Sequence, residues 1–595
     1  MVLQRLESAY QTVLAALLAE RAPEGHWVGE LSTSALSTAT TVAALALVQK
    51  ASKARGSFET PIAGGIDWLA AHQNDNGGWG DTVRSFSNIS TTMLCRAAFH
   101  LTGTASAHEK TLQRCEVWLH TRYGSTPEEL AEAVRARYGK DRTFSVPILM
   151  TSALAGLVSW SEVPSLPFEL ACFPQSWFRF LRIPVVSYAL PALIAIGQAV
   201  YHHRPPWNPL MRGIRRLAIE KSLRVLQKIQ PTGGGFLEAA PLTSFVTMAL
   251  ASIGRADHPA VDKCVAFLVN SVRPDGSWPI DTNLATWVTT LSINALATAG
   301  ELDNLDRKDT LCDWLLRQQY KERHPYTGAD PGGWAWTDLS GGVPDADDTP
   351  GALLALHHLN STCTAEIDDG FAWFWTLQNR DEGIPTFCRG WGHLPFDRSG
   401  CDLTAHVLRA LASRYEGRTP QRILSTNQLV GLRDGGLRYL ARHQRADGSW
   451  LPLWFGCQHA PDDENPTYGT ARVLAAYRDL DLMSGDPAKR GIAWLLSVQN
   501  ADGGWGGAAN TPSSIEETAL AVEVLLDAGD TTQPAVERGL AWLIERIESG
   551  GLAEATPIGF YFAKLWYFEK LYPLIFSVAA LGRARRKFAS SEARR

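Results

Sequence analysis

The chain has 595 residues, of which 45% are hydrophobic and 20% charged, and its formal net charge is −5. This length favours more than one domain, and the lack of a basic excess argues against nucleic-acid binding. The nine Cys are scattered without a Cys-x-x-Cys pair, which indicates buried thiols in a reducing compartment rather than a disulfide framework. The 21 Trp are unusually many, so we expect a repeated structural use of Trp or an aromatic cavity.

The N-terminal segment, residues 1–21, has an amphipathic helical pattern with Glu7 and Glu20 inside it. It lacks the basic start and the uninterrupted apolar core of a signal peptide. The most apolar stretch, residues 183–200, is short and contains Pro184 and Pro191, so no transmembrane span is predicted. An apolar surface helix that dips into a bilayer without crossing it stays open.

A short pattern recurs along the chain: an aromatic-Leu pair, then a Gln, then a turn closed by Gly and Trp. Copies lie at residues 65–79, 267–278, 314–334, 436–450 and 491–505, and the Gln of the third copy is Gln318. Gly permits the turn, Trp can cap a helix end, and Gln can bond backbone groups that helix ends leave unpaired.

Helical patterns follow most of these turns, at residues 90–101, 286–297, 350–359 and 514–526. Each unit is therefore a helix, a Trp-closed turn and a second helix, and stacked helix pairs bury what one pair cannot. This predicts an all-α fold in which most Trp are structural. Residues 143–209, 383–401 and 451–467 depart from the pattern and read as Pro-rich or aromatic loops that could line a cavity.

Three carboxylates, Asp345, Asp347 and Asp348, stand within four positions, directly after a segment rich in Gly and Pro. In a water-poor pocket they cannot all stay ionised, because like charges a few ångströms apart raise the affinity for a proton. One of them should then be a carboxylic acid at neutral pH. The alternative is a solvated turn or a helix N-cap, which is the commoner use of Asp beside Gly and Pro.

The order of these motifs resembles the squalene-hopene cyclases, the bacterial branch of the class II terpene cyclases. The resemblance runs nearly end to end and includes the segments 27–31, 87–92, 345–349 and 402–407. It implies two α/α-barrels with a large apolar cavity between them. One barrel, residues 1–22 and 300–595, would carry the Asp motif, and residues 23–299 would form the inserted second barrel. It also implies a peripheral, monotopic position on the cytoplasmic side of a membrane, and relatives suggest a homodimer.

The chemistry that the resemblance implies is redox-neutral and free of metal and cofactor. A carboxylic acid protonates a terminal C=C bond of a folded polyprene such as squalene, rings close in sequence, and the last cation loses a proton or captures water. By similarity, Asp347 is the proton donor, Asp348 and Asp345 flank it, His406 is its hydrogen-bonding partner, and Asp402 orients His406. Protonating an alkene needs a strong acid held away from water, which such a cluster can supply. Taken alone, His406 would be a core histidine.

Carbocations in an apolar cavity lack counterions, so aromatic faces must stabilise them. The resemblance assigns this role to Trp287, Trp336, Trp454, Tyr468, Tyr188, Phe560, Tyr561 and Phe562. For each of them the alternative is the core of a repeat.

The chain also departs from the family pattern. Tyr188 stands where the family has Trp, residues 380–385 replace a Gly-x-Trp turn, and Leu or Ala replaces a water-positioning Gln after Gly235. Lys564, Glu569 and Lys570 stand where a neutral aromatic wall is expected. Substrate length, extent of cyclisation and the terminating step therefore stay open.

Other functions remain as alternatives. The same mechanism could act on a diterpene, sesquarterpene or meroterpenoid precursor. A protein-prenyltransferase-like toroid would need a zinc site of Asp, Cys and His, and Cys388 with His393 does not make a complete set of ligands. A non-catalytic toroid would need no acid cluster. Residues 462–464 resemble a magnesium-binding acidic motif, but Pro461 and Pro466 around them indicate a surface loop.

Overall fold

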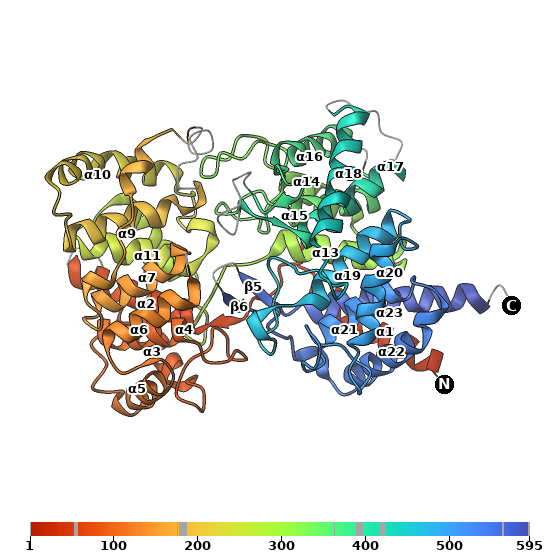
Figure 1. Ribbon diagram of the computed structural model, residues 1–595, viewed down its shortest axis with the longest axis horizontal. Helices are drawn as coiled ribbons and strands as arrows, with labels where there is room; N and C mark the ends of the chain where they lie inside the picture. The colour runs from red at the N-terminus through yellow and green to blue at the C-terminus, as the bar shows by residue number, and fades with distance from the viewer. Residues whose placement is uncertain are drawn as a thin grey trace.

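The computed structural model describes residues 2–52, 57–139, 141–174, 177, 187–361, 363–387, 397–416, 424–561 and 564–592. Within these residues the chain forms two groups of helices that stand side by side (Figure 1). The N-terminal half makes one group and the C-terminal half the other, except that α1 (Val2–Ala19) packs in the second group on α22 (Gln533–Glu548) and α23 (Tyr572–Glu592). The predicted all-α fold is confirmed.

The first group is an α/α-barrel whose inner helices contact one another in a closed ring. These helices are α2 (Ala35–Ala51), α4 (Ile89–Leu101), α7 (Arg142–Leu154), α9 (Leu190–His203) and α11 (Ala240–Ser252). They are rich in Ala, Ser, Thr and Leu on all sides, which is typical of helices buried all round. The outer helices are α3 (Glu59–Ala71), α5 (Glu109–Tyr123), α6 (Pro127–Tyr138), α10 (Pro209–Ile229) and α12 (Pro259–Asn270).

The second group is a larger α/α-barrel with its own closed inner ring. The ring consists of α13 (Ala285–Ala299), α15 (Asp348–His358), α17 (Cys401–Glu416), α19 (Pro466–Asp479), α21 (Ile515–Leu525) and α23. Outside it lie α1, α14 (Lys308–Arg317), α16 (Thr364–Leu377), α18 (Thr426–His443), α20 (Asp486–Ser497) and α22. Because α13 packs between α15 and α23, we propose that this barrel begins at α13 rather than at residue 300.

The Trp-closed turns join the helices as the sequence predicts. The indole N–H groups of Trp79, Trp278, Trp450 and Trp505 each donate to the carbonyl of a Leu ten residues earlier, at 2.7–2.9 Å. The Gln side chains donate to the turn and to the first turn of the next outer helix: Gln499 Nε2 bonds the carbonyl oxygens of Gly503 at 2.8 Å and Ala535 at 2.9 Å. The predicted capping by Trp and Gln is confirmed.

One copy of the repeat differs by a residue from the predicted register. Gln318 Nε2 donates back to Trp314 O in its own helix, at 2.8 Å. Its neighbour Gln319 makes the joining bonds instead, to Gly332 O and Glu366 O, both at 2.8 Å. Gln318 and Gln319 fit the repeat pattern equally well in the sequence. The position at which α14 ends determines which of the two side chains faces the turn.

The described residues also contain three short antiparallel strand pairs: β1 (Thr33–Ser34) with β2 (Trp278–Pro279), β3 (Ile384–Pro385) with β4 (Ser399–Gly400), and β5 (Gly559–Tyr561) with β6 (Leu565–Tyr567). The β5–β6 hairpin lies between the barrels (Figure 1). The buried carboxylate of Asp81, in the first barrel, accepts the backbone N–H of Trp566 at 2.9 Å, which ties the hairpin to that barrel. Among the described helices, none is both long and apolar enough to cross a membrane.

Candidate active site

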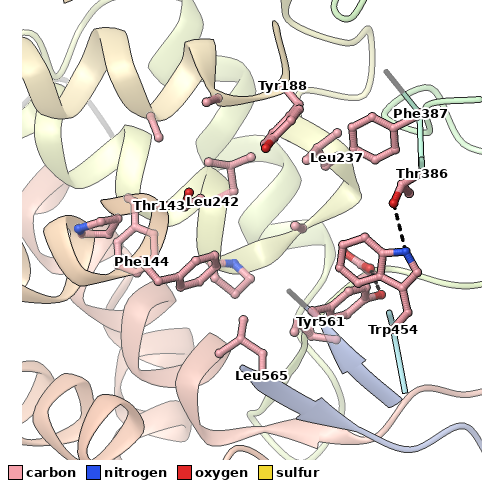
Figure 2. Close-up of a pocket in the computed structure, with 18 of the residues that line it drawn as sticks. Thr143, Phe144, Tyr188, Leu237, Leu242, Thr386, Phe387, Trp454, Tyr561 and Leu565 are labelled. Atoms are coloured by element: carbon pink, nitrogen blue, oxygen red, sulfur yellow. Dashed lines mark hydrogen bonds between the residues drawn. The ribbon is translucent and has the colours of Figure 1, made fainter. Parts of the chain in front are cut away.

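A cavity of about 510 Å³ lies between the two barrels. Its wall comes from α7, α9 and α11 on one side and from α13, the segment before α15 and the β5–β6 hairpin on the other. Figure 2 shows part of this wall, with the labelled side chains of Phe144, Leu242, Tyr188, Phe387, Trp454 and Tyr561 around the space. The volume is within the range of about 300–1,000 Å³ usual for small-molecule sites, and the lining is mostly apolar and aromatic, which suits a hydrocarbon ligand.

The three clustered Asp lie at the start of α15 and all line the cavity. Asp345 Oδ1 accepts the backbone N–H groups of Asp347 at 2.9 Å and Asp348 at 2.8 Å, so Asp345 caps the helix. Asp345 and Asp348 are buried, with 3% and 2% of their surface exposed, whereas 20% of the Asp347 side chain is exposed. Asp347 is therefore the member of the cluster best placed to meet a molecule in the cavity.

Burial governs the protonation of this cluster. It raises the pKa of Asp345 to about 8, with the charge of Asp347 adding to the effect, and the pKa of Asp347 to about 7. Burial, with the neighbouring Asp345 carboxylate as second cause, raises the pKa of Asp348 well above its usual value. The cluster therefore holds at least one proton at neutral pH.

His406, on α17, faces Asp347, but it does not form a short bond to it. His406 Nδ1 lies 3.9 Å from Asp347 Oδ1, beyond hydrogen-bond distance. Burial lowers the pKa of His406 well below its usual value, and the positive charges of Arg409 and Arg472 lower it further. His406 is therefore neutral at pH 7 and supplies no charge to the acid.

Asp402 has a different place from the one predicted. Its two carboxylate oxygens accept the backbone N–H of Leu453 at 3.1 and 3.0 Å. Within the described residues it forms no hydrogen bond to His406, so it does not orient that ring. Instead it anchors the segment that carries Trp454, and burial raises its pKa to about 7.

The cation next to the acid is Arg472, which the sequence analysis missed. Its guanidinium lies over the rings of Tyr468, at 4.8 Å, and Phe576, at 5.2 Å. Its Nη2 is buried and has no hydrogen-bond partner among the described residues. Of the charges around Asp347, that of Arg472 is the one that lowers its pKa, against the effect of burial.

Arg472 shares a small space with the acid. Asp347, Asp402, His406, Arg409, Arg472, Trp287 and Tyr468 line a void of about 10 Å³, close to the volume that one water needs. A weak signal for Arg472 exists in the sequence: it follows Tyr468 by four residues, which places both on the same face of α19.

The predicted aromatics divide into groups. Those that line the cavity are Trp287, Trp336, Trp454, Tyr188 and Tyr561. Tyr468 stacks on Phe455 at 3.8 Å and lines the small void beside the acid. Phe560 points to the other face of β5 and packs on Trp566 at 4.2 Å, away from the cavity lining. Phe562, and also Cys388 and His393, lie outside the described residues.

Other candidate motifs take no part in this site. Residues 462 and 463 belong to a 3₁₀ turn (Pro461–Asp463) at the surface, where the sequence predicts a loop, and Glu464 follows it. Glu464 forms an ion pair with Arg445 at 2.7 Å. In the described part of the chain no group of three His, Cys, Asp or Glu side chains is placed to hold a metal ion.

Family models match almost the whole chain: the squalene-hopene cyclase N-terminal domain over residues 11–279 and the C-terminal domain over residues 283–586. The chain belongs to the squalene-hopene cyclase family. It is 25% identical over 666 residues to a probable squalene–hopene cyclase of Sinorhizobium fredii, covering 96% of both chains. It is 28% identical over 312 residues to drimenyl diphosphate synthase of Streptomyces showdoensis, covering 50% of this chain and 51% of that one.

Solved structures share the fold of this squalene-hopene cyclase family member. The ent-copalyl diphosphate synthase from Streptomyces platensis matches with a TM-score of 0.54 at 19% identity, covering 98% of this chain and 99% of that chain. The relatives are class II terpene cyclases whose names differ in substrate and product. The family therefore establishes a terpene cyclase, and the choice of substrate needs its own argument.

Proposed function

We propose that this protein cyclises squalene to a polycyclic triterpene of the hopene type, and that Asp347 supplies the initiating proton. The observation that carries the proposal is the placement of a carboxyl group with a raised pKa in the wall of an apolar, aromatic cavity. A carboxylic acid in such a place can protonate an alkene, because the mostly apolar lining offers few other acceptors for the proton.

Each neighbour of Asp347 has a role in this proposal. Asp345 fixes the acid by capping α15, and Asp348 lowers the charge of the cluster by keeping a proton. Arg472 stabilises the carboxylate that remains when the proton has left. The faces of Trp287, Trp336 and Trp454 stabilise the cations that form as each ring closes.

The charges of the lining favour an uncharged substrate. Among the described lining residues Arg142 is the one cation, whereas Asp281 and the three clustered Asp are acidic. A diphosphate group carries several negative charges and is usually bound by several cations or N–H donors. A hydrocarbon such as squalene carries no charge and needs no cation in the cavity lining.

The test is incubation of the purified protein with squalene in detergent micelles in D₂O, followed by mass spectrometry of the products. We expect cyclic isomers of squalene that carry one deuterium from the initiating acid. Asp347→Asn should lower turnover by at least about 100-fold, the size of a lost general acid. Asp462→Asn, on the exposed 3₁₀ turn, is the matched control and should leave turnover unchanged. Equal turnover by Asp347→Asn and the wild type would refute the role of the acid.

A shorter prenyl substrate is the second candidate, and Arg142 is the observation that favours it. This exposed side chain stands at the N-terminus of α7 and also lines the cavity, so it could meet an anionic head group there. Geranylgeranyl diphosphate in the same assay separates the two candidates. Unchanged squalene together with a cyclic diphosphate product would establish the second.

We also propose that the protein rests on a membrane through an apolar patch on the first barrel. The patch consists of the exposed side chains of Phe173, Trp177, Trp207, Leu210, Ile214 and Leu217. Trp207 is 89% exposed and Leu217 84%, which is unusual for large apolar residues. The helix α10, which carries Leu210 and Leu217 on one face, also carries Arg212 and Arg216, as helices that bind at a lipid surface often do.

The patch lies close to the cavity wall. The 3₁₀ helix η2 (Phe168–Cys172) packs on both α9 and α10, and Leu166 and Pro167 just before it line the cavity. A substrate dissolved in lipid could therefore reach the cavity from this side. Flotation with anionic liposomes tests the proposal: replacing Trp207, Leu210 and Leu217 by Ser should release the protein from the vesicles. The control replaces the exposed Trp375 and Leu482 by Ser and should still float.

A further inference from the structure

A second carboxyl group lines the cavity and takes no part in the acid cluster. Asp281 is 5% exposed and lies between β2 and α13. The hydroxyl of Tyr561 donates a hydrogen bond to Asp281 Oδ2. Among the described residues Oδ1 accepts no hydrogen bond, although Asp281 has no ion-pair partner that would neutralise it. One oxygen is therefore held by a tyrosine, and the other is available to the cavity.

An aromatic wall runs from the acid to Asp281. The ring of Trp287 packs edge-on against His406 at 6.1 Å, and its Nε1–H donates to Tyr572 Oη at 2.9 Å. Tyr572 Oη lies 3.5 Å from Tyr567 Oη, and the ring of Tyr567 stacks on Tyr561 at 4.7 Å. Asp347 and Asp281 thus stand at the two ends of a row of contacting aromatic side chains, of which Trp287, Tyr567 and Tyr561 line the cavity.

Tyr567 lies in the middle of this row, and the negative charges of both carboxyl groups affect its pKa. Burial raises the pKa of Tyr567 most, and the negative charges of Asp347 and Asp281 raise it further. Asp347 and Asp281 line the same cavity, so a folded chain that meets Asp347 at its first double bond can meet Asp281 with a later carbon. Cations that form along this path are stabilised by the tyrosine faces until one comes within reach of Asp281.

The other groups around Asp281 cannot take its place. Glu238, its nearest acidic neighbour, accepts the backbone N–H of Gly341 at 2.7 Å and the hydroxyl of Thr282 at 3.3 Å. Glu238 is not among the described residues that line the cavity, and its carboxylate bonds to protein groups instead. Burial raises the pKa of the Tyr561 phenol well above its usual value, so the phenolate that could accept a proton does not form near neutral pH.

We propose that Asp281 is the base that ends the cyclisation by taking a proton from the last carbocation. This rests on the proposed function. The C–H bond next to the cationic carbon breaks, its electron pair becomes the π bond of the product alkene, and the proton moves to Asp281 Oδ1. Asp347 has lost one proton and Asp281 has gained one, so substrate and product are isomers. Exchange with water then returns both carboxyl groups to their starting states.

Tyr561 acts as a positioning residue for this step. Its hydrogen bond to Oδ2 holds the carboxylate in one orientation and leaves Oδ1 facing the cavity. Its ring also packs against Trp454 at 6.5 Å, so the aromatic wall and the base are fixed together. The product alkene should therefore have its double bond at one defined position.

The test compares product distributions of the wild type and Asp281→Asn with whichever polyprene the wild type consumes. We expect Asp281→Asn to consume substrate at a rate within about tenfold of the wild type, since the initiating acid is intact. The main wild-type alkene should fall at least about tenfold relative to alcohols and alkene isomers, because a missing base costs about 10²–10⁴-fold in the step it serves. Tyr561→Phe, which keeps the carboxylate, should shift products the same way but less.

Glu238→Gln is the matched control, because it neutralises a buried acid next to Asp281 without changing the cavity lining, and it should leave products unchanged. An unaltered product distribution in Asp281→Asn overturns the proposal, as does a wild type whose only product is an alcohol. Loss of the proposed function is a separate result: the wild type would then consume neither squalene nor a shorter polyprene. Tyr561→Phe keeps the test decisive if Asp281→Asn does not fold.

Discussion

Arg472 should set the pH range in which the enzyme works. The change to make is Arg472→Gln, which removes the positive charge next to Asp347 and keeps a polar side chain of similar length. In the wild type, burial raises the pKa of Asp347 to about 7 and the Arg472 charge opposes that rise. Without the charge, the pKa of Asp347 should rise further.

The size of the shift follows from the surroundings of the two groups. An opposite charge within about 4–6 Å lowers the pKa of a carboxyl by about 1–3 units, and a more distant one lowers it less. We expect the lower end, about 1 unit or about 1.4 kcal/mol, because the Arg472 charge also interacts with Tyr468 and Glu523. In the proposed mechanism Asp347 must be protonated to act, so activity is present below its pKa and is lost as pH rises through it. The wild-type loss should centre near pH 7, and that of Arg472→Gln near pH 8.

The assay is the pH dependence of kcat with saturating substrate. Besides the moved limb, the acidic plateau of Arg472→Gln should fall by about threefold to tenfold, since a weaker acid protonates an alkene more slowly. Arg409→Gln is the control: Arg409 lines the same small void but pairs with Asp479 at 2.6 Å, so its loss should leave the limb in place. A lowered plateau with an unmoved limb in Arg472→Gln would mean that Arg472 only supports packing, and the reasoning would be refuted.

Three further predictions concern stability and products. Because burial raises the pKa of Asp347 in the folded state, its contribution to the free energy of unfolding is lost as pH rises from about 4 to about 7. Asp347→Asn should therefore have a higher Tm than the wild type at pH 8. At pH 4 the two Tm values should be similar. The buried Nε1–H of Trp336 lacks an acceptor among the described residues. Trp336→Phe should therefore leave the products unchanged, and its free energy of unfolding should equal that of the wild type or exceed it by about 1 kcal/mol. Trp336→Leu removes the aromatic face and should release incompletely cyclised products, which mass spectrometry detects. Gln444→Leu removes bonds to Gly448 O and Pro487 O and should cost about 2–3 kcal/mol in chemical unfolding while leaving the product pattern unchanged.

The repeats could be predicted because their signal is local. The Trp and Gln of a turn act on backbone groups about ten residues away or on the next helix, so the sequence spacing carries the geometry. The place of the Asp cluster at a helix start could be predicted for the same reason, since Asp345 accepts the backbone N–H of Asp348, the first residue of α15. The proposed role of Asp347 as an acid came instead from the resemblance to the family. Arg472 and Asp281 could not be ranked from sequence, because their importance comes from residues more than 100 positions away that the fold brings beside them. The expected bond between Asp402 and His406 failed similarly: helical spacing allows it, but the Leu453 amide, from another loop, takes both carboxylate oxygens.

The opposing effects on Asp347 explain how a carboxyl group can be both protonated and acidic enough. Burial alone would hold the proton firmly and make a weak acid, whereas the α15 N-terminus and Arg472 both favour the carboxylate. At the other end of the aromatic wall, burial raises the pKa of Asp281 to about 7 as well, and the Tyr561 hydroxyl opposes that rise. In the proposed mechanism a proton leaves Asp347 and another arrives at Asp281, and burial raises the pKa of both groups in the same direction. The driving force of the reaction is then the conversion of π bonds into σ bonds in the substrate, and the protein need only keep the two carboxyl groups in opposite protonation states when a substrate binds.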